Sequence, residues 1–280
     1  MENTILVPID FSEQSMIALE QSYNLAKLSH SSITLLNVIK TGSSFWGIFS
    51  DNEKKDFELK IEQKLRKTAK SVEEKIGIDV GVIMRMGKVS EEILRVADYL
   101  APKLIVMGTT SGINISRKIV GSRTLHIIKT SKYPILSVKG KDHTQGCENI
   151  LLPIDATKET IQKVDLAIDL ALLFKAKITV VSAISKSKKK HLKLISISLD
   201  EIKNRIEQSN IICDIETFYT SDSKDSMAKE IIGLAHKVNA DLLMIMTQQE
   251  KGLSEFFLGS LARNIIFSSD IPVLTTIPRK

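Results

Sequence analysis

An internal duplication constrains the fold of this 280-residue chain more than any other feature of its sequence. The stretch NTILVPIDFSEQSMIALEQSYNLAKLSHSSITLLNVI aligns with NILLPIDATKETIQKVDLAIDLALLFKAKITVVSAI, so that Ile9-Asp10 falls on Ile154-Asp155. Further along, Gly121-Ser122 falls on Gly259-Ser260. Self-similarity over such lengths indicates two copies of one structural unit. We expect residues 1–140 and 149–280 to form two similar domains, with the polar stretch GKDHTQGCE between them.

Composition is that of an ordinary soluble globular protein, with 43% hydrophobic and 26% charged residues. No apolar run approaches the roughly 20 residues of a membrane span. The start, MENTILVPID, resembles a first strand more than a signal peptide. We therefore expect a cytoplasmic protein without a membrane partner. The two cysteines and five histidines lack the spacing of a disulfide framework or a metal site, and Cys213 is expected to be a small core residue.

The net charge of +6 permits weak attraction to polyanions but does not require it. Most lysines alternate with acidic residues, as in DNEKKDFELKIEQKLRKTAKSVEEK, which is typical of a solvated helix face with i,i+4 ion pairs. The one concentrated basic run, KSKKKHLK at 186–193, has no aromatic residues beside it for base stacking. We interpret this run as a surface loop, and we expect no nucleic-acid partner.

Each half alternates short apolar runs with amphipathic segments, which predicts alternating strands and helices. In the helix expected at 12–29, Met16, Leu19, Tyr23 and Ala26 form one apolar stripe. Right-handed crossovers would join the strands into a doubly wound parallel five-stranded sheet with helices on both faces. The strands of the first half are expected at 4–9, 32–39, 79–87, 103–108 and 133–138, and the further helices at 52–76, 90–99 and 119–131.

Ligands of such sheets bind beyond the carboxyl ends of the strands, where the strand order reverses. Asp10 and Val38 follow or end the first two strands, and the segment MGTTSGINISRKIVGS follows the fourth. A carboxylate can accept hydrogen bonds from a ribose or an adenine amino group, and the Val38 backbone can read an adenine edge. Glycines before a helix let phosphates approach backbone N–H groups. Alternatively, Asp10 is only a helix N-cap, since DFSE has the spacing of a capping box.

The segments ILVPIDFSE, LLNVI and MGTTSG…VGS…PILSV resemble the universal stress protein family, and the duplication resembles its tandem two-domain form. This resemblance covers nearly the whole chain. It implies a fold like that of the adenine nucleotide alpha-hydrolases, with the two domains packed as a pseudo-two-fold dimer through their final strands. Whether two chains also form a homodimer stays open.

Members of that family that bind ATP have a loop of the form Gly-x2-Gly-x9-Gly-Ser/Thr. The first half has Gly108, Gly121 and Ser122 in register, whereas Ser111 stands at the second glycine position and Gly112 follows it. The resemblance therefore implies a site for ATP or AMP, alone or with Mg²⁺, in the first domain. Besides the glycines and Ser122, the site would use Asp10 and Val38, and Arg117, Lys118 and Arg123 would make its surroundings positive.

The second half departs from the same pattern. Met246 replaces the first glycine, and Gln249 and Glu250 follow where phosphates would lie, although Asp155, Gly259 and Ser260 are retained. A carboxylate near a phosphate opposes binding. We therefore expect one nucleotide per chain, bound by the first half.

Three classes of function fit these features. The family resemblance implies a stress-response regulator that binds a nucleotide without turning it over. The alternatives are a scaffold of the same fold that needs no nucleotide, and an enzyme that hydrolyses ATP or transfers adenylate. The sequence has no GKS/T phosphate loop and no paired carboxylates, so we expect no enzyme, with weak ATP hydrolysis left open. The aromatic stretch TGSSFWGIFSDNE, at 41–53, is packed under the following helix, or it forms a mobile lid or a partner-docking patch near the site.

Overall fold

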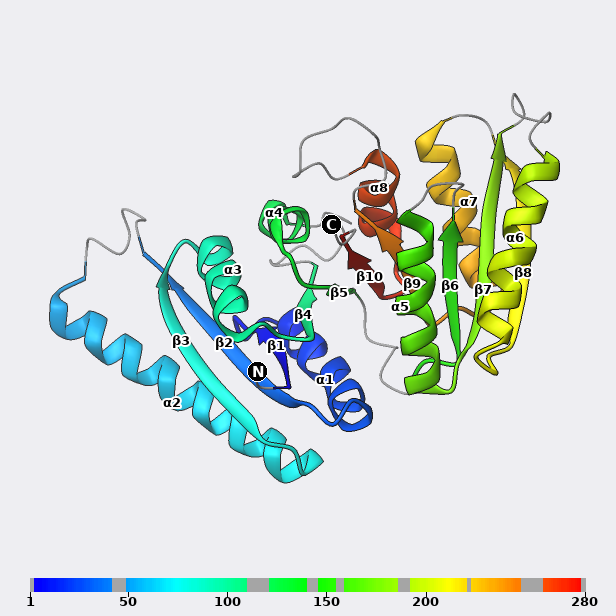
Figure 1. The fold of residues 1–280 in the computed structure, drawn as a ribbon. Helices are drawn as coiled ribbons and strands as arrows, with labels where there is room; N and C mark the ends of the chain where they lie inside the picture. The colour runs from blue at the N-terminus through cyan, green and yellow to red at the C-terminus, as the bar shows by residue number, and fades with distance from the viewer. Residues whose placement is uncertain are drawn as a thin grey trace. The chain divides into compact units, whose positions relative to one another are not determined.

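The computed structural model describes residues 3–41, 49–109, 121–139, 146–154, 159–185, 192–220, 223–247 and 259–277. The chain forms two compact units (Figure 1). Described residues up to Val138 belong to the first unit, and those from Lys139 onward belong to the second. The aromatic stretch at 42–48 and the basic run at 186–191 lie outside the described residues, so the two hypotheses about them stay predictions.

The first unit alternates strands and helices throughout, as its apolar periodicity predicts. Its elements are β1 (Thr4–Pro8), α1 (Glu13–Leu28), β2 (Ser32–Lys40), α2 (Asp51–Ile76), β3 (Val80–Gly87), α3 (Val89–Leu100), β4 (Leu104–Gly108), α4 (Ser122–Thr130) and β5 (Ile135–Val138).

Its five strands are parallel and lie in the order β3-β2-β1-β4-β5. Because a right-handed crossover places its helix on a face set by the direction of travel, α1 and α2 cover one face and α3 and α4 the other (Figure 1). The direction of winding reverses between β1 and β4. The predicted doubly wound sheet is confirmed, and its topological switch point lies between these two strands.

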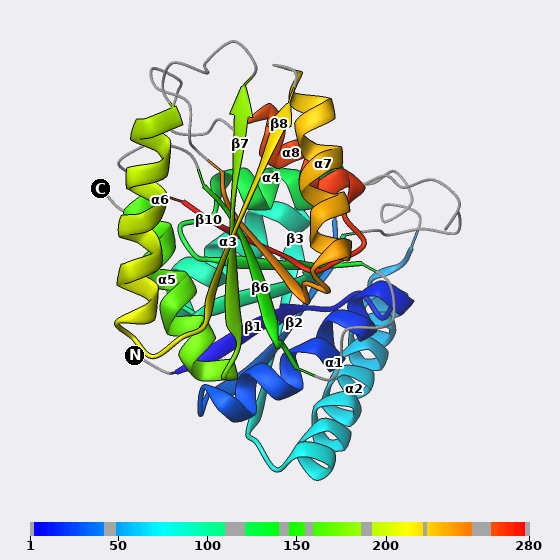
Figure 2. The same ribbon diagram turned by 90° about the vertical axis from the view of Figure 1, so that its right-hand side faces the viewer.

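The second unit repeats this topology. Its parallel strands lie in the order β8-β7-β6-β9-β10, and α5 and α6 cover the face opposite to α7 and α8 (Figure 2). The elements are β6 (Asn149–Ile154), α5 (Glu159–Phe174), β7 (Lys177–Ser185), α6 (Leu192–Glu207), β8 (Cys213–Thr220), α7 (Lys224–Lys237), β9 (Leu242–Met246), α8 (Ser260–Ser268) and β10 (Val273–Thr276).

Each sheet is buried between its two helix layers, and this explains why the strands are apolar on both sides. Cys213 is a buried residue of β8, as predicted, and burial raises the pKa of its thiol to about 11. In α1 the predicted apolar stripe is only half right. Leu19 and Ala26 are fully buried, but Met16 and Tyr23 lie at the edge of the buried face. Polar residues complete that face: Ser15, Gln21 and Ser22.

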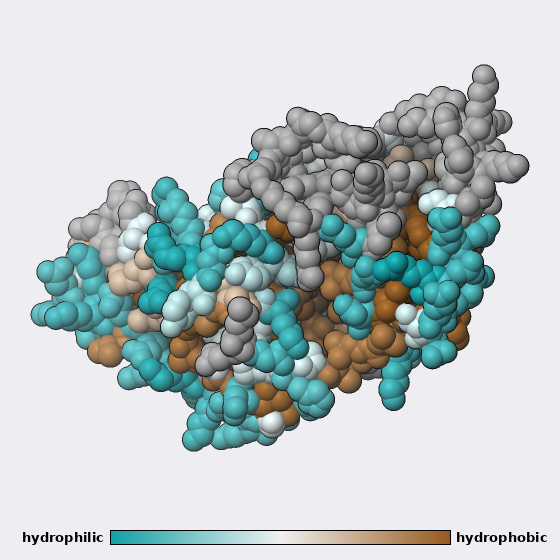
Figure 3. Space-filling model, in the orientation of Figure 1, coloured by the Kyte–Doolittle hydropathy of each residue, from teal (hydrophilic) through white to brown (hydrophobic). Residues whose placement is uncertain are grey.

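Helix α2 is largely solvated, as its alternating charges predict, and hydrophilic residues gather over it in Figure 3. Its buried stripe is narrow, consisting of Leu65, Ala69 and Val72. The Glu62–Arg66 pair (2.7 Å) is one of its i,i+4 contacts. None of the helices in the described part of the chain is both long and apolar enough to cross a membrane.

Candidate ligand-binding site

A cavity of about 200 Å³ lies in the first unit at the carboxyl ends of β1, β2 and β4, beside the switch point. Its volume, counted from the described residues, is below the 300–1,000 Å³ of ordinary small-molecule pockets. It is lined by Pro8, Ile9, Asp10, Ser12, Gln14, Ser15, Leu36, Val38, Lys40, Val89, Ile93, Met107, Gly108, Arg123, Thr124 and Ile127. The structure thus brings together three predicted site residues, Asp10, Val38 and Gly108.

The turn between β1 and α1 holds the Asp10 carboxylate at the cavity wall. Asp10 Oδ1 accepts hydrogen bonds from the backbone N–H of Ser12 (3.0 Å) and from its hydroxyl. Ser12 in turn is the N-cap of α1, because its Oγ accepts a hydrogen bond from the Ser15 N–H (3.3 Å). The alternative that Asp10 itself caps the helix is therefore wrong. Asp10 instead orients the serine that does so.

The Asp10 carboxylate is ionised at neutral pH. Burial acts to raise its pKa, but hydrogen bonds from the Ser12 hydroxyl and amide and from Ser15 outweigh that effect. The pKa of Asp10 consequently lies below its ordinary value of 3.8. An acceptor that is charged at neutral pH, at the end of β1, suits ligand hydroxyl or amino groups.

Strand β2 continues past the end of β1, and its backbone groups beside the cavity have no β1 partner among the described residues. The last bond of the β1–β2 ladder joins the Ile9 N–H to the Leu36 carbonyl oxygen (2.8 Å). The next acceptor, the Ile9 carbonyl oxygen, takes the Asn37 side-chain amide instead (2.7 Å). Because alternate residues of a strand direct their peptide groups to the same side, the Val38 N–H and C=O face this opening. Val38 therefore offers one donor and one acceptor at this opening, and its predicted role in reading an adenine edge stays a prediction.

Gly108 permits a close approach between β4 and α1. A Cβ at this position would lie 2.7 Å from the backbone oxygen of Gln14 and 2.8 Å from its carbonyl carbon. Only glycine leaves room for the first turn of α1 there. This packing constraint explains the glycine without a ligand, although Gly108 also lines the cavity.

The expected role of Gly121 is wrong in one respect: its amide is not open. The Gly121 N–H donates to the Thr109 carbonyl oxygen (3.1 Å), and Gly259 N–H donates to Thr247 in the same way (3.1 Å). Gly121 has φ −60° and ψ 142°, a conformation that any residue adopts. The retained glycines of both halves therefore use their N–H groups to fix the backbone just before α4 and α8. Neither Gly121 nor Ser122 is among the described residues that line the cavity.

The first turn of α4 nevertheless provides donors. The first bond within the helix runs from the Leu125 N–H to the Gly121 carbonyl oxygen, and no side chain caps this end. Within the described ranges, the N–H groups of Ser122, Arg123 and Thr124 have no partner. Such groups carry the positive end of the helix dipole and favour an anion.

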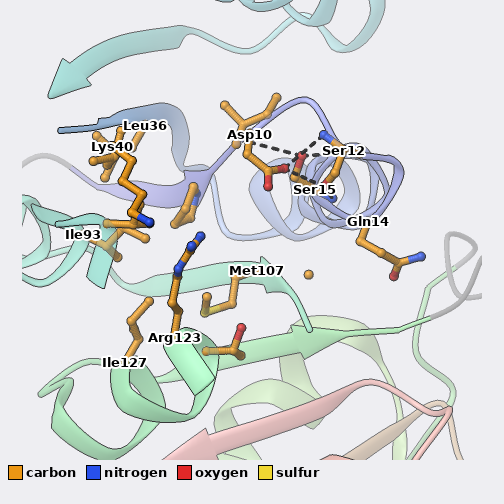
Figure 4. Close-up of a pocket in the computed structure, with 16 residues that line it drawn as sticks. Asp10, Ser12, Gln14, Ser15, Leu36, Lys40, Ile93, Met107, Arg123 and Ile127 are labelled. Atoms are coloured by element: carbon orange, nitrogen blue, oxygen red, sulfur yellow. Dashed lines mark hydrogen bonds between the residues drawn. The ribbon is translucent and has the colours of Figure 1, made fainter. Parts of the chain in front are cut away.

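Two cations extend into the same cavity. Figure 4 shows the Arg123 side chain reaching in from α4 and that of Lys40 from the end of β2, with the Asp10 carboxylate facing the same space. In the described part of the chain, neither cation forms an ion pair. Lys40 is the charged residue of the described lining that sequence reasoning missed. Residues two apart lie on the same face of a strand, and Lys40 follows Val38 by two residues. This spacing could have identified Lys40 as a site residue.

Several predicted groups lie outside the described residues. They are Ser111, Gly112, Arg117 and Lys118 in the first half, and Asp155, Gln249 and Glu250 in the second. Their roles stay predictions.

The second unit keeps some apolar counterparts of the cavity lining, such as Pro153 and Ile154, but differs at three positions that matter for a ligand. Strands β2 and β7 align along their whole length, which places Ser185 at the position of Lys40. Helices α4 and α8 align likewise, so Leu261 stands where the first unit has Arg123. Met246, which is buried, replaces Gly108. The second unit thus lacks both cations.

These features define a class: an α/β protein of two doubly wound units, one with a cavity at its switch point that two cations and a carboxylate line. The family model of the universal stress protein family matches residues 1–139 and again 146–276. The chain belongs to that family, in a tandem form, and the expected resemblance is confirmed.

Relatives of single-domain length match half of the chain. The universal stress protein MJ0577 of Methanocaldococcus jannaschii is 32% identical over 158 residues, which are 51% of this chain and 98% of that protein. The universal stress protein YxiE of Bacillus subtilis is 32% identical over 152 residues, 50% of this chain and 100% of that protein.

Solved structures confirm the fold over the full length. A universal stress protein from Archaeoglobus fulgidus has a TM-score of 0.82 at 20% identity, with 100% of each chain covered. A structure from Pseudomonas aeruginosa has a TM-score of 0.75 at 19% identity and covers 99% of this chain and 94% of that one. The tandem arrangement is thus shared with proteins of very different sequence.

Proposed function

We propose that the first unit binds an adenine nucleotide, ATP or AMP, in the cavity between β1, β2 and α4, and that the protein acts as a nucleotide-responsive regulator. One observation carries this proposal: a carboxylate, the end of strand β2 and two cations line a single cavity. A nucleotide has matching parts, since its nucleoside carries hydrogen-bond donors and acceptors and its phosphates are anionic.

The two parts of the ligand would use opposite sides of the cavity. The Val38 N–H and C=O would pair with the acceptor and amino group of an adenine edge, and Asp10 would accept from a ribose hydroxyl. Lys40, Arg123 and the free N–H groups of α4 would hold phosphate oxygens by charge-assisted hydrogen bonds.

Binding without turnover fits the described lining better than catalysis. A general base works best with a pKa near the working pH. The pKa of Asp10 is instead lowered, and the cavity lining includes no other carboxylate among the described residues. Asp10 is thus suited to hold a ligand in place.

Isothermal titration of the intact chain with ATP, AMP and adenosine tests this proposal. Substitution Lys40→Ser introduces the residue of the second unit and should weaken ATP binding by about ten- to hundred-fold, the value of one charge-assisted hydrogen bond. Adenosine binding should be unchanged. Lys229→Ser, at an exposed position of α7, is the control for a lost surface charge.

The possible outcomes separate the proposals. Absence of heat with all three ligands would favour the scaffold that needs no nucleotide. An equal loss for ATP and adenosine in Lys40→Ser would mean that the lysine does not contact the phosphates. Steady release of phosphate from ATP would instead indicate an enzyme.

A further inference from the structure

The second unit contains a fully buried lysine at its switch point. Lys163 lies in α5, and only 1% of it is exposed to solvent. Its Nζ donates a hydrogen bond to the carbonyl oxygen of Pro153 in β6. Burying an ammonium group is costly, so such a residue needs an explanation.

The counterpart of this contact in the first unit lies at the cavity wall. Pro153 aligns with Pro8, which lines the cavity, and Lys163 aligns with Ala18, a fully buried residue of α1. The Lys163 ammonium therefore lies in the second unit where the first unit has the end of β1 and its cavity. A methyl group in one unit corresponds to a four-carbon chain with a charge in the other.

A second side chain of the second unit, that of Met246, is also larger than its counterpart in the first unit, and it lies on the other side of the same crevice. Met246 ends β9 and is only 2% exposed, whereas its counterpart Gly108 has no side chain. In the first unit, even a Cβ at that position would meet the backbone of Gln14 at 2.7 Å. The first turn of α5 must therefore lie farther from β9 than α1 does from β4.

We propose that Lys163 and Met246 fill the ligand crevice of the second unit from within, and that Lys163 is the residue that keeps nucleotides out of it. The ammonium is tethered at the end of β6 and already bonded to Pro153, so an entering ligand would have to displace it. Loss of the two cations removes attraction for phosphate, but Lys163 removes the space itself. The second unit is then closed whichever ligand the first unit takes.

Transferring the lysine to the first unit tests the assignment. Ala18→Lys should direct an ammonium to the Pro8 carbonyl oxygen and abolish ATP binding in calorimetry, while the protein stays folded by circular dichroism. Leu28→Lys adds the same charge to an exposed position at the end of α1 and should bind ATP as the wild type does. Undiminished binding by folded Ala18→Lys would overturn the proposal.

Amine labelling tests the filled crevice without any nucleotide. Reductive methylation of the wild-type chain, followed by mass spectrometry, should modify Lys163 at least ten-fold more slowly than Lys229 and Lys237, which are exposed on α7. Equal rates would mean an open crevice and would overturn the proposal even if Ala18→Lys fails to fold. If the wild type binds no nucleotide, the proposed function fails, and labelling alone still decides whether Lys163 fills the second unit.

Discussion

At the scale of single residues, Gly108 connects packing with the site, because it lets α1 touch the end of β4. We predict that Gly108→Ala lowers the free energy of unfolding by about 1–3 kcal/mol, since its Cβ would overlap the Gln14 backbone. Gly233→Ala is the matched control. Nothing lies within 4 Å of its added Cβ, and alanine should stabilise α7 by about 0.4–1 kcal/mol. Urea denaturation measures the free energy of unfolding of both variants. A value for Gly108→Ala equal to that of the wild type would contradict the packing argument.

Asp10 makes the stability of the folded chain depend on pH. Its pKa is lower in the folded chain than its ordinary value of 3.8, so its contribution to stability is fully present above that value. The contribution is lost as the pH falls through the folded pKa. We predict that the stability difference between wild type and Asp10→Asn is constant from pH 6 to 8 and shrinks below about pH 4. Denaturation midpoints of the two proteins across this pH range test the direction of the change. A stability difference that grows in acid would refute the prediction.

Sequence patterns locate the candidate residues better than they describe their contacts. Asp10, Val38 and Gly108 were found because strand ends are visible as ends of apolar runs. Lys40 was missed because the strand was expected to end at residue 39, whereas β2 includes Lys40. The amide of Gly121 was expected to be open because its partner, Thr109, is recognisable only in three dimensions.

At the scale of elements, the turn from β1 to α1 is strained and is braced by a third element. Phe11 has φ 62°, and Lys64 of α2 lies 4.2 Å from the centre of its ring. Phe11→Ala keeps the strained backbone, whereas Phe11→Gly relieves it, and both lose the ring. We predict that Phe11→Gly is more stable than Phe11→Ala by about 1–2 kcal/mol, the cost of a left-handed conformation. Equal stabilities in chemical denaturation would argue against strain at this turn.

Most elements were predictable because apolar runs and helical periodicity are strong here, and the predicted bounds in the first unit differ by only a few residues from those observed. The stripe of α1 was misplaced for a physical reason. Ser15 and Ser22 are small and satisfy their hydroxyls within the helix, so they can be buried, yet a hydropathy pattern counts them as exposed.

At the scale of the whole molecule, the duplication predicts two copies of one fold, and this is confirmed. The predicted pairing of the two final strands stays a prediction. The sequence pattern shows that Met246, Gln249 and Glu250 interrupt the glycine loop of the second copy, but it could not reveal which other side chains reach the crevice. Lys163, for example, lies in a helix where a lysine would usually be assigned to the surface.

The difference between the units leads to our last prediction: one adenine nucleotide per chain, bound by the first unit. Arg123→Leu gives the first unit the residue of the second and should weaken ATP binding by about ten- to hundred-fold, since it removes a charge-assisted contact. The reverse change, Leu261→Arg, should not create a second site, because Ser185 and Met246 remain and Lys163 still fills the crevice. Native mass spectrometry counts the bound nucleotides, and calorimetry gives the affinities. Two equivalent sites in the wild type, or a second nucleotide in Leu261→Arg, would refute the asymmetry, because either result requires an open crevice in the second unit.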